Sequence, residues 1–410
     1  MIGRSLAAIA LAGVLSGCKV GPDYVQPPTN VPTAFRGVDT KTAQSLGDLK
    51  WAEVFADPQL QSLIAGALVK NFDVRIAVQH VLEARAQLAG AKGNQSPTLG
   101  ATAQGQYERT LSGVQNPPYF DMWEKSFGVQ LSYEVDLWGR LARSTEAARA
   151  QFLASEAARQ AVLTTIVSSV ASGYLQLLEL DLELQVTRET LAARQDSLRL
   201  TQIRLQGGVA SLQDVRQAET LVDGSLAAVP QIQRQIEQTE NVLSLLLGRY
   251  PGPIPRGLPL LQQLNLPDAP PGIPANLLER RPDIRQAEQS LVAANAQIGA
   301  AKGLLLPTFQ ITGSSAVVNT LLSGVGSLGT AGIFALLGAA NQLIFDGGRV
   351  RSGVAFAEAQ KDEAVAVYQR TVVTGVREVS DALADYRFGI QTVRQQQALA
   401  AAVRDSLRLA

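Results

Sequence analysis

The sequence contains very few of the residues that carry chemistry at metal sites and active sites. It has one cysteine, Cys18, and one histidine, His80. One cysteine excludes a disulfide within the chain, and the two residues together supply too few ligands for a structural zinc site. His80 lies on a helical pattern beside Val81 and is interpreted as a residue of a helix face. We therefore expect no metal, no cofactor and no catalytic centre.

Neither sign of charge is in excess, and long apolar runs are also missing. The chain of 410 residues has 36 Lys and Arg against 36 Asp and Glu. This balance argues against a protein that binds nucleic acid, which needs a surplus of positive charge. Beyond the N-terminus no run of eighteen apolar residues occurs, so we expect no transmembrane helix. If the chain crosses a membrane, it must do so with β-strands.

The N-terminus has the pattern of an export signal. A short basic start, Met1–Arg4, precedes a short apolar run, Leu6–Val14. That run is too short to span a bilayer, which is typical of a cleaved signal. It ends in Leu-Ser-Gly-Cys, which resembles a bacterial lipoprotein signal with the only cysteine at the cleavage position. We expect a signal at residues 1–17, lipid attachment at Cys18, and a proline-rich extended strap over residues 18–57.

An internal repeat organises the rest of the chain. Matching runs recur at an offset of 210 or 209 positions: Asp73–Ala77 with Asp283–Ala287, Ala86–Gly93 with Ala296–Gly303, Pro97–Thr98 with Pro307–Thr308, and Asp196–Leu200 with Asp405–Leu409. Each copy is predicted to contain a helix, two strands and a long helix. The expected boundaries are 58–250 for the first repeat, 251–276 for a linker and 277–410 for the second repeat. The second repeat stops before its second hairpin helix, so we expect a truncated form of a longer protein.

Long helices are indicated by apolar residues at alternating steps of three and four. One such heptad seam begins at Leu163 and continues to Leu205 without proline, which is typical of a coiled coil. As one helix, residues 141–205 would be roughly 95 Å long at 1.5 Å per residue. Glycines in Gln206–Ser211 predict a turn, and a second seam over 215–246 predicts a return helix. These elements together predict an antiparallel helical hairpin.

Apolar and polar residues alternate in two segments of the first copy, Leu99–Glu108 and, more strictly, Ser126–Leu137. The loop between them is expected over Leu111–Lys125. The second copy has a less regular pair, over Thr308–Val318 and roughly Ile333–Phe345. Period-two alternation fits a sheet with one apolar and one polar face. On pattern alone, a membrane barrel and a half-buried soluble sheet are equally good interpretations.

Four strands cannot close a barrel, because the smallest membrane barrels have about eight. An open strand edge is not viable in lipid. If the strands span a membrane, several chains must therefore pool them, although the strand count does not choose between two chains and three. In that case the polar face of the second strand would line the lumen, with Gln130, Ser132, Glu134 and Asp136.

Several motifs occur in the order found in a known family. They are the lipoprotein start and the runs Trp51–Pro58, Leu277–Arg285 and Phe345–Arg349. Together they resemble the TolC-like outer-membrane factor family, and within it the lipoproteins that serve efflux pumps of the resistance-nodulation-division type. The resemblance covers nearly all of the mature chain and favours the membrane interpretation of the strands. It implies an all-α-dominated α+β membrane protein, in which three chains pool four transmembrane strands each into a twelve-stranded β-barrel above a long α-helical coiled-coil tunnel.

The resemblance also implies sites at the tip of the helical hairpin. Asp214 and Arg216 match the position of a periplasmic gate, and Gly208, Val209 and Ser211 match the tip residues that meet an adaptor protein. For Asp214 the alternative is a carboxylate that favours the start of a helix. For the tip residues the alternative is ordinary turn chemistry, and both roles are compatible.

The implied function is that of the outer-membrane channel in a tripartite efflux system, a passive duct for small molecules and not an enzyme. The implied partners are two sister chains, outer-membrane lipid, a periplasmic adaptor (membrane fusion protein) and an inner-membrane efflux pump; no nucleic acid is expected. Two alternatives remain. One is an outer-membrane factor for type I protein secretion, against which the lipid anchor and the Arg281-Pro282-Asp283 run argue. The other is a structural coiled-coil lipoprotein of the periplasm.

Overall fold

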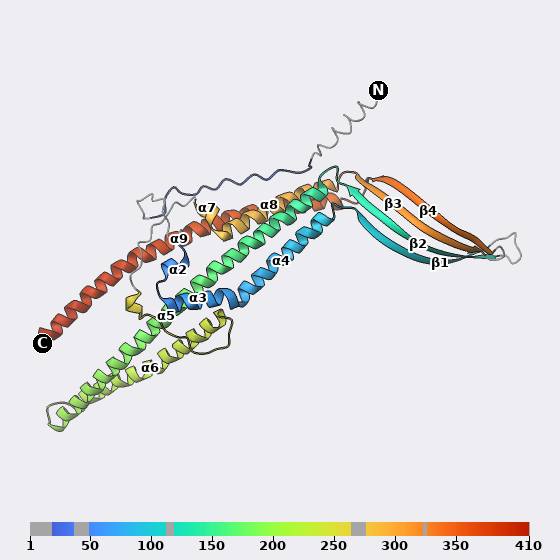
Figure 1. Ribbon diagram of the computed structural model, residues 1–410. Helices are drawn as coiled ribbons and strands as arrows, with labels where there is room; N and C mark the ends of the chain where they lie inside the picture. Colours follow the sequence, from blue (N-terminus) through green and yellow to red (C-terminus); the bar gives the residue numbers. More distant parts are fainter. Residues whose placement is uncertain (1–18, 37–48, 112–118, 264–275, 323–325, 410) are drawn as a thin grey trace. The chain divides into compact units, whose positions relative to one another are not determined.

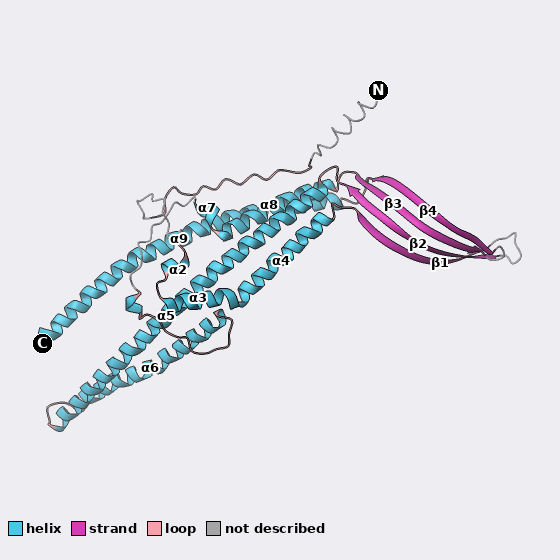
Figure 2. Cartoon of the chain, in the orientation of Figure 1, coloured by secondary structure: helices cyan, strands magenta, loops and turns pink. Residues whose placement is uncertain are grey.

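The computed structural model describes residues 19–36, 49–111, 119–263, 276–322 and 326–409. Cys18 and the expected signal lie outside these residues. The chain forms two compact units. The first contains Met1–Thr29, Leu82–Ser155 and Gln286–Thr371, and the second contains Asn30–Val81, Glu156–Arg285 and Val372–Ala410. Figure 1 labels the elements, and Figure 2 separates the helices from the four strands.

The first unit holds one antiparallel sheet of four strands, in the order β1-β2-β3-β4 (Figure 1). The strands are β1 Thr98–Leu111, β2 Tyr119–Val135, β3 Thr308–Leu322 and β4 Gly326–Asn341. The two hairpins of the repeat therefore lie side by side, with β2 paired to β3. Among the described strands, β1 and β4 each pair on one side only. The sheet thus has two open edges.

The sequence predicted the existence of all four strands but misplaced some of their ends. β2 begins at Tyr119, six residues before the end of the expected loop Leu111–Lys125, because Tyr119–Glu124 pair with β1. β4 runs from Gly326 to Asn341 and so begins and ends earlier than the expected Ile333–Phe345. Its end is set by pairing with β3, which begins at Thr308 opposite Asn341. The sequence of β4 is rich in Gly and Ala and shows no alternation that could have revealed this register.

Helices adjoin the inner ends of the strands in the first unit. They are parts of α4 Phe72–Gly93, α5 Arg140–Gln206, α8 Pro282–Gly303 and α9 Arg349–Leu409. Many of their buried residues are alanines: Ala84, Ala147, Ala150, Ala154, Ala293, Ala296, Ala300 and Ala357. Small side chains at helix contacts allow the helix axes to approach closely. The long helices predicted from the heptad seam are confirmed.

Residues 19–36 of the expected strap are extended, and their first part packs on α5, α8 and α9 of the first unit, whereas residues Trp51–Val54 of the expected strap form a short helix. Gly21 has a φ of 102° and lies so closely against Gly299 that a Cβ on Gly21 would clash with the Gly299 Cα. The buried Arg143 guanidinium donates to Asp23 at 2.7 Å. The Tyr24 hydroxyl donates to Glu288 at 3.2 Å, and burial together with Glu288 raises the pKa of Tyr24. These contacts join the strap to both copies of the repeat.

The second unit contains the antiparallel helical hairpin. α5 is followed by a tight turn and by α6 Leu212–Leu246. All seam positions predicted on α6 are buried or half-buried, among them Val215, Val222, Ile232 and Leu243. On α5 the Arg194 guanidinium donates to the Ser225 hydroxyl at 2.7 Å, so a polar contact also crosses the seam. The hairpin prediction is confirmed.

The core of the second unit forms where α2 Trp51–Val54, α3 Pro58–Lys70, α5 and α6 meet. Buried Asp57 lies at the start of α3, and its carboxylate accepts hydrogen bonds from the Tyr174 hydroxyl, Gln263, and the backbone N–H groups of Gln59 and Leu258. Burial raises the pKa of Tyr174 to about 12, and the bond to Asp57 acts in the same direction. The network joins three segments that are distant in the sequence.

The expected linker, residues 251–276, is anchored to the second unit over its described part. Ile254 is buried, and Arg256 pairs with Asp181 at 2.8 Å and also with Glu240. A short 3-10 helix, η2 Leu260–Gln262, follows. After it come α7 Leu277–Arg280 and Arg281, which pairs with Asp283 and with Glu378 of α9. This part of the linker is therefore a packed connection.

The expectation that no helix is apolar enough to span a membrane was wrong for α5. By length and composition alone, α5 meets that condition. Its most apolar stretch, residues 161–178, contains no charged side chain. Ile166, Val170 and Leu177 of this stretch are buried in the core of the second unit. Packing against α3 and α6 accounts for the buried third of the stretch.

Candidate functional sites: a two-faced sheet, a polar groove and a helical tip

The sheet has one apolar face and one polar face. Strand pairing places Phe127 beside Ala103 and Val317, and Val129 beside Ala101 and Ser315. Phe127 is 65% exposed and Val129 45% exposed. Side chains at alternate positions point to the opposite face. That face carries mostly polar groups from three strands: Thr102, Gln104, Gln106, Gln130, Ser132, Gln310, Thr312 and Ser314. On the same face β4 contributes the apolar Ile333 and Leu337.

Three of the four residues expected to face a lumen lie on this polar face. Ser132 accepts a hydrogen bond from Gln310 of β3 at 3.1 Å, and Gln130 lies two positions along β2. Glu134 is held by the Arg140 guanidinium, with oxygen–nitrogen distances of 2.7 and 2.8 Å. Asp136 was wrongly assigned to the strand. β2 ends at Val135, and the Asp136 carboxylate accepts the N–H of Ala142 in the first turn of α5.

A cluster of aromatic and charged side chains marks the hairpin end of the apolar face. The rings of Tyr107 and Trp123 lie 4.7 Å apart on neighbouring strands. Arg109 forms a two-point contact with Asp121, at 2.6 and 3.1 Å, and its guanidinium lies 4.5 Å from the centre of the Tyr119 ring. Tyr107 also donates to Asp121 at 2.8 Å. The cluster closes the apolar face at its end away from the helices.

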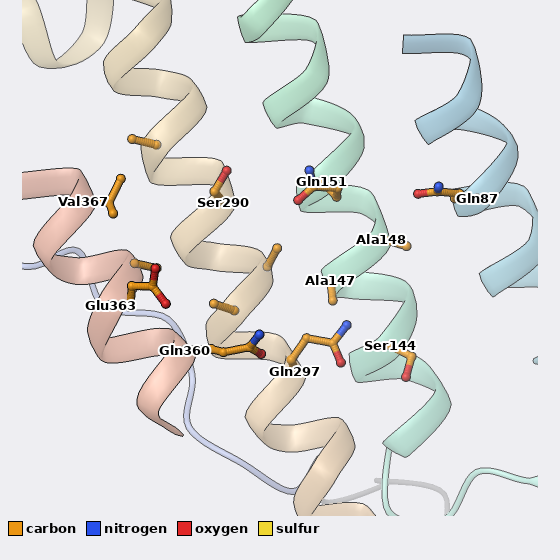
Figure 3. A pocket seen from close by; sticks show the side chains of 14 residues that line it. Gln87, Ser144, Ala147, Ala148, Gln151, Ser290, Gln297, Gln360, Glu363 and Val367 are labelled. Carbon is orange, nitrogen blue, oxygen red and sulfur yellow. The ribbon is translucent and has the colours of Figure 1, made fainter. Parts of the chain in front are cut away.

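A polar groove crosses the helices of the first unit (Figure 3). It has a volume of about 530 Å³ and runs over α4, α5, α8 and α9. Four glutamines line it, Gln87, Gln151, Gln297 and Gln360, and they form two pairs related by the repeat offset: 210 positions for Gln87 and Gln297, and 209 for Gln151 and Gln360. Glu363 is the one charged residue among its lining residues. The groove therefore offers amide donors and acceptors among small apolar residues, with one carboxylate.

The groove and the strap lie on opposite sides of α8. Glu288 and Asn295 bond the strap, and seven residues along a helix return to nearly the same direction. Ser290 and Gln297 line the groove, and at about 100° per residue they point roughly 180° away from that direction. Because the strap lies on the other side of α8, it does not cover the groove. The groove was not predicted from the sequence, although the glutamines repeated at the offset of 210 or 209 positions signal it.

The tip of the helical hairpin combines a glycine turn with a capped helix. Gly208 has a φ of 74°, which only glycine adopts without strain, and Val209 is 77% exposed. Ser211 caps α6, and its N–H and hydroxyl both donate to Asp214, at 2.7 and 2.8 Å. The bonds from Ser211 hold the pKa of Asp214 below its usual range. Asp214 thus has the alternative role considered above, that of a carboxylate at the start of a helix.

The two gate candidates do not contact each other within the described part of the chain. Asp214 is engaged by Ser211, and Arg216 pairs with Glu219 at 2.7 Å in the next turn of the same helix. Both groups are exposed. Any network between them needs groups from outside this hairpin.

The matching family model is described as "Outer membrane efflux protein" and covers residues 63–249 and 273–410. Among curated proteins, the chain is 34% identical over 417 residues to the probable efflux pump outer membrane protein TtgC of Pseudomonas putida, which covers 99% of this chain and 86% of that protein. It is 32% identical over 387 residues to the cation efflux system protein CusC of Escherichia coli, over 92% of this chain and 82% of that one.

Solved structures agree with this likeness. The open state of the MtrE outer membrane channel of Neisseria gonorrhoeae superposes with a TM-score of 0.83 at 30% identity, over 96% of this chain and 87% of the other. A membrane protein of Pseudomonas aeruginosa gives a TM-score of 0.82 at 34% identity, over 96% and 89%. The fold expected from the family resemblance and the outer-membrane location are confirmed. The chain belongs to the outer membrane efflux protein family.

Proposed function

We propose that three copies of this chain form a passive duct, in which their sheets join into one twelve-stranded barrel across the outer membrane. The observation that carries the proposal is a sheet with one apolar face, one largely polar face and two open edges. Unpaired N–H and C=O groups cannot remain in the hydrocarbon of a bilayer. Pairing the open edge of β1 with the open edge of β4 from a sister chain satisfies both edges in a closed ring.

The dimensions of the apolar face support a membrane span. Tyr133 and Trp123 lie ten positions apart on β2 and bracket Phe127, Val129 and Leu131, with Lys125 next to Trp123 at the outer margin. Ten residues extend about 34 Å along a strand. With a strand tilt of roughly 40°, this covers about 25 Å, which is the height of the apolar band of outer-membrane barrels.

The proposed lumen continues from the polar sheet face to the glutamine groove. The strap runs on the other side of α8, and a lipid on Cys18 would require the strap to lie outside the duct. The four glutamine amides of the groove both donate and accept hydrogen bonds, and Glu363 is the one charged residue among the residues that line it. These features support a conduit for small molecules and give no role to catalysis.

The proposed partners are a periplasmic adaptor and an inner-membrane pump that supplies the energy. The tip presents exposed Val209 on a tight glycine turn, with Gly208 and Ser211 on either side. This is a compact apolar contact for another protein. Asp214 and Arg216 are proposed as gate residues, since they lie beside this tip and would face their counterparts from sister chains.

Heating experiments test the duct. The full-length protein in detergent should migrate as a trimer without boiling and as a monomer after boiling, and light scattering should give a mass of three chains. A soluble monomer without detergent would contradict the proposal and favour a periplasmic tether. A deletion strain that remains resistant to toxic small molecules but fails to secrete a protein would favour type I secretion.

The anchor is tested separately. Cys18→Ser should abolish labelling with a radioactive fatty acid, while the trimer on unheated gels should persist because the barrel holds it. Wild-type protein without labelled lipid would refute the anchor and leave the duct intact.

A further inference from the structure

We propose that Lys125 on the lipid-facing side of β2 binds the phosphate of a phosphorylated lipid headgroup in the outer leaflet. The inference rests on the proposed membrane span of the sheet. Lys125 has the same parity along β2 as Phe127 and Trp123, so its side chain leaves the sheet on the apolar face. It lies between these two residues, next to the aromatic cluster that closes this face and on the side nearer the helices.

Charge is divided between the two faces of the sheet. The β1–β2 hairpin, residues 98–135, contains six charged residues, Glu108, Arg109, Asp121, Glu124, Lys125 and Glu134. Arg109 and Lys125 lie on the apolar face together with Asp121. Glu108, Glu124 and Glu134 are at even-numbered positions and point to the opposite face. Glu124 is adjacent to Lys125 in sequence and therefore points to the other side. Asp121 is already engaged by Arg109 and Tyr107.

No other part of the proposed barrel can neutralise Lys125. The β3–β4 hairpin, residues 308–341, contains no Asp or Glu, and neither do residues 112–118. Beside Lys125, strand pairing places Gly105 on β1 and Asn319 on β3. A sister chain would add β4 next to β1, and β4 has no charge. Among the described residues Lys125 takes part in no ion pair, so a counter-ion must come from the surroundings.

The position of Lys125 selects the headgroup region of the outer leaflet. The inner ends of the strands adjoin the helices, so the hairpin end is the outer one. The Tyr107 and Trp123 rings, which contact each other at a tilt, lie one alternate position closer to that end, and such rings gather at membrane interfaces. A lysine stem can follow the apolar surface and bring its ammonium to this level. There the anion within reach is a lipid phosphate, which an ammonium binds by a charge-assisted hydrogen bond.

Reconstitution of the full chain tests the assignment. The wild-type protein, Lys125→Gln and the control Glu124→Gln are placed in phosphatidylcholine vesicles with and without lipid A, a diphosphorylated acylated disaccharide. The melting of the oligomer is followed on unheated gels, and retained lipid A is counted by native mass spectrometry. Wild type and Glu124→Gln should bind lipid A and melt at a higher temperature in its presence. Lys125→Gln should bind at least about tenfold more weakly and lose this difference.

Three outcomes would overturn the assignment. Equal retention of lipid A by Lys125→Gln and wild type would show that the lysine is only a snorkelling side chain. A stabilisation of wild type by inorganic phosphate in phosphatidylcholine alone would assign a free-anion site. Failure of all three proteins to form oligomers in vesicles would instead reject the proposed membrane span, and the lipid site with it.

Discussion

The two strand hairpins of this protein share one architecture but differ in chemistry. Both are antiparallel, both follow an equivalent helix, and they pair with each other through β2 and β3. The β1–β2 hairpin carries six charged residues, and the β3–β4 hairpin carries none. On β4, Ile333 and Phe334 point to opposite faces, so this strand is apolar on both. The repeat has kept the backbone and the pairing, while the composition of the faces has diverged.

The difference implies a division of labour around the proposed barrel. β1, β2 and β3 supply the polar lining, and the first hairpin also supplies the charged and aromatic end of the outer face. β4 supplies small and apolar residues along an open edge. Glycine and alanine let a neighbouring strand approach without steric conflict, which suits an edge that must pair with another chain.

The largest expected effect comes from placing a charge on the apolar face of either hairpin. Val129→Arg and Val317→Arg should each cost roughly 2–4 kcal/mol, because an arginine near the middle of the bilayer is poorly solvated. The assembled oligomer on unheated gels should be lost or strongly reduced. Gln130→Arg and Val318→Arg, one position along, point to the other face and serve as controls. If all four variants assembled equally well, the two faces would not differ in environment.

A second comparison uses a position at which the copies of the repeat differ. Gly299 of α8 corresponds to Ala89 of α4, and only Gly299 lies under the strap. A Cβ on Gly299 would lie 2.6 Å from the Val20 carbonyl oxygen and 2.8 Å from Arg143. Gly299→Ala should therefore displace the strap and destabilise the protein by about 1–3 kcal/mol, despite the better helix propensity of alanine.

The control for that variant is Gly90→Ala on α4, where an added Cβ meets no atom within 4 Å. It should stabilise the helix by up to about 1 kcal/mol. Thermal unfolding in detergent measures both variants. A Gly299→Ala protein as stable as wild type, with the strap equally protected from protease, would show that the close approach is dispensable.

The helix α9 that follows the second hairpin starts with an aspartate cap, and this cap predicts that its stability depends on pH. The N–H of Val350 donates to Asp346 at 2.7 Å and holds the pKa of Asp346 below its usual range. The stabilisation from this carboxylate is present above its usual pKa and is lost as the pH falls through the lower value of the folded state. Asp346→Asn should thus melt lower than wild type at neutral pH, and the gap should narrow in acid. A difference in melting temperature that stays constant down to the lowest pH at which the protein folds would contradict this prediction.

The smallest effect is expected at the tip. Asp214→Ala removes the acceptor for the N–H and hydroxyl of Ser211 and should fray the first turn of α6. Faster amide hydrogen exchange at residues 211–215, with unchanged exchange in the buried part of α6, would show this local role. Asp223→Ala, farther along the exposed side of the helix, is the control.

Local features of the fold could be predicted from the sequence, and long-range ones could not. The hairpin tip followed from the glycines of Gln206–Ser211, and the seams of α5 and α6 followed from their period. The bond of Asp57 to Tyr174 joins residues 117 positions apart, and no local pattern signals it. The register of β4 depends on β3 for the same reason.

The candidate site divides in a similar way. Gln130 and Ser132 were assigned to the polar face correctly because β2 alternates strictly. Asp136 was misassigned because the alternation continues by chance beyond the strand, and only the bond to Ala142 reveals the start of the helix. The ion pair of Arg109 with Asp121 depends on the strand register of the first hairpin, which the misplaced loop had concealed.

Accessibility of single cysteines tests the central claim, that alternate residues of β2 face hydrocarbon and water. The chain has one native cysteine, Cys18, so Cys18→Ser provides a background without thiols. In outer membranes, a membrane-impermeant maleimide should label Gln130→Cys and Ser132→Cys through the lumen and leave Phe127→Cys and Val129→Cys unlabelled until detergent or denaturant is added. Rapid labelling of all four positions in intact membranes would contradict the account.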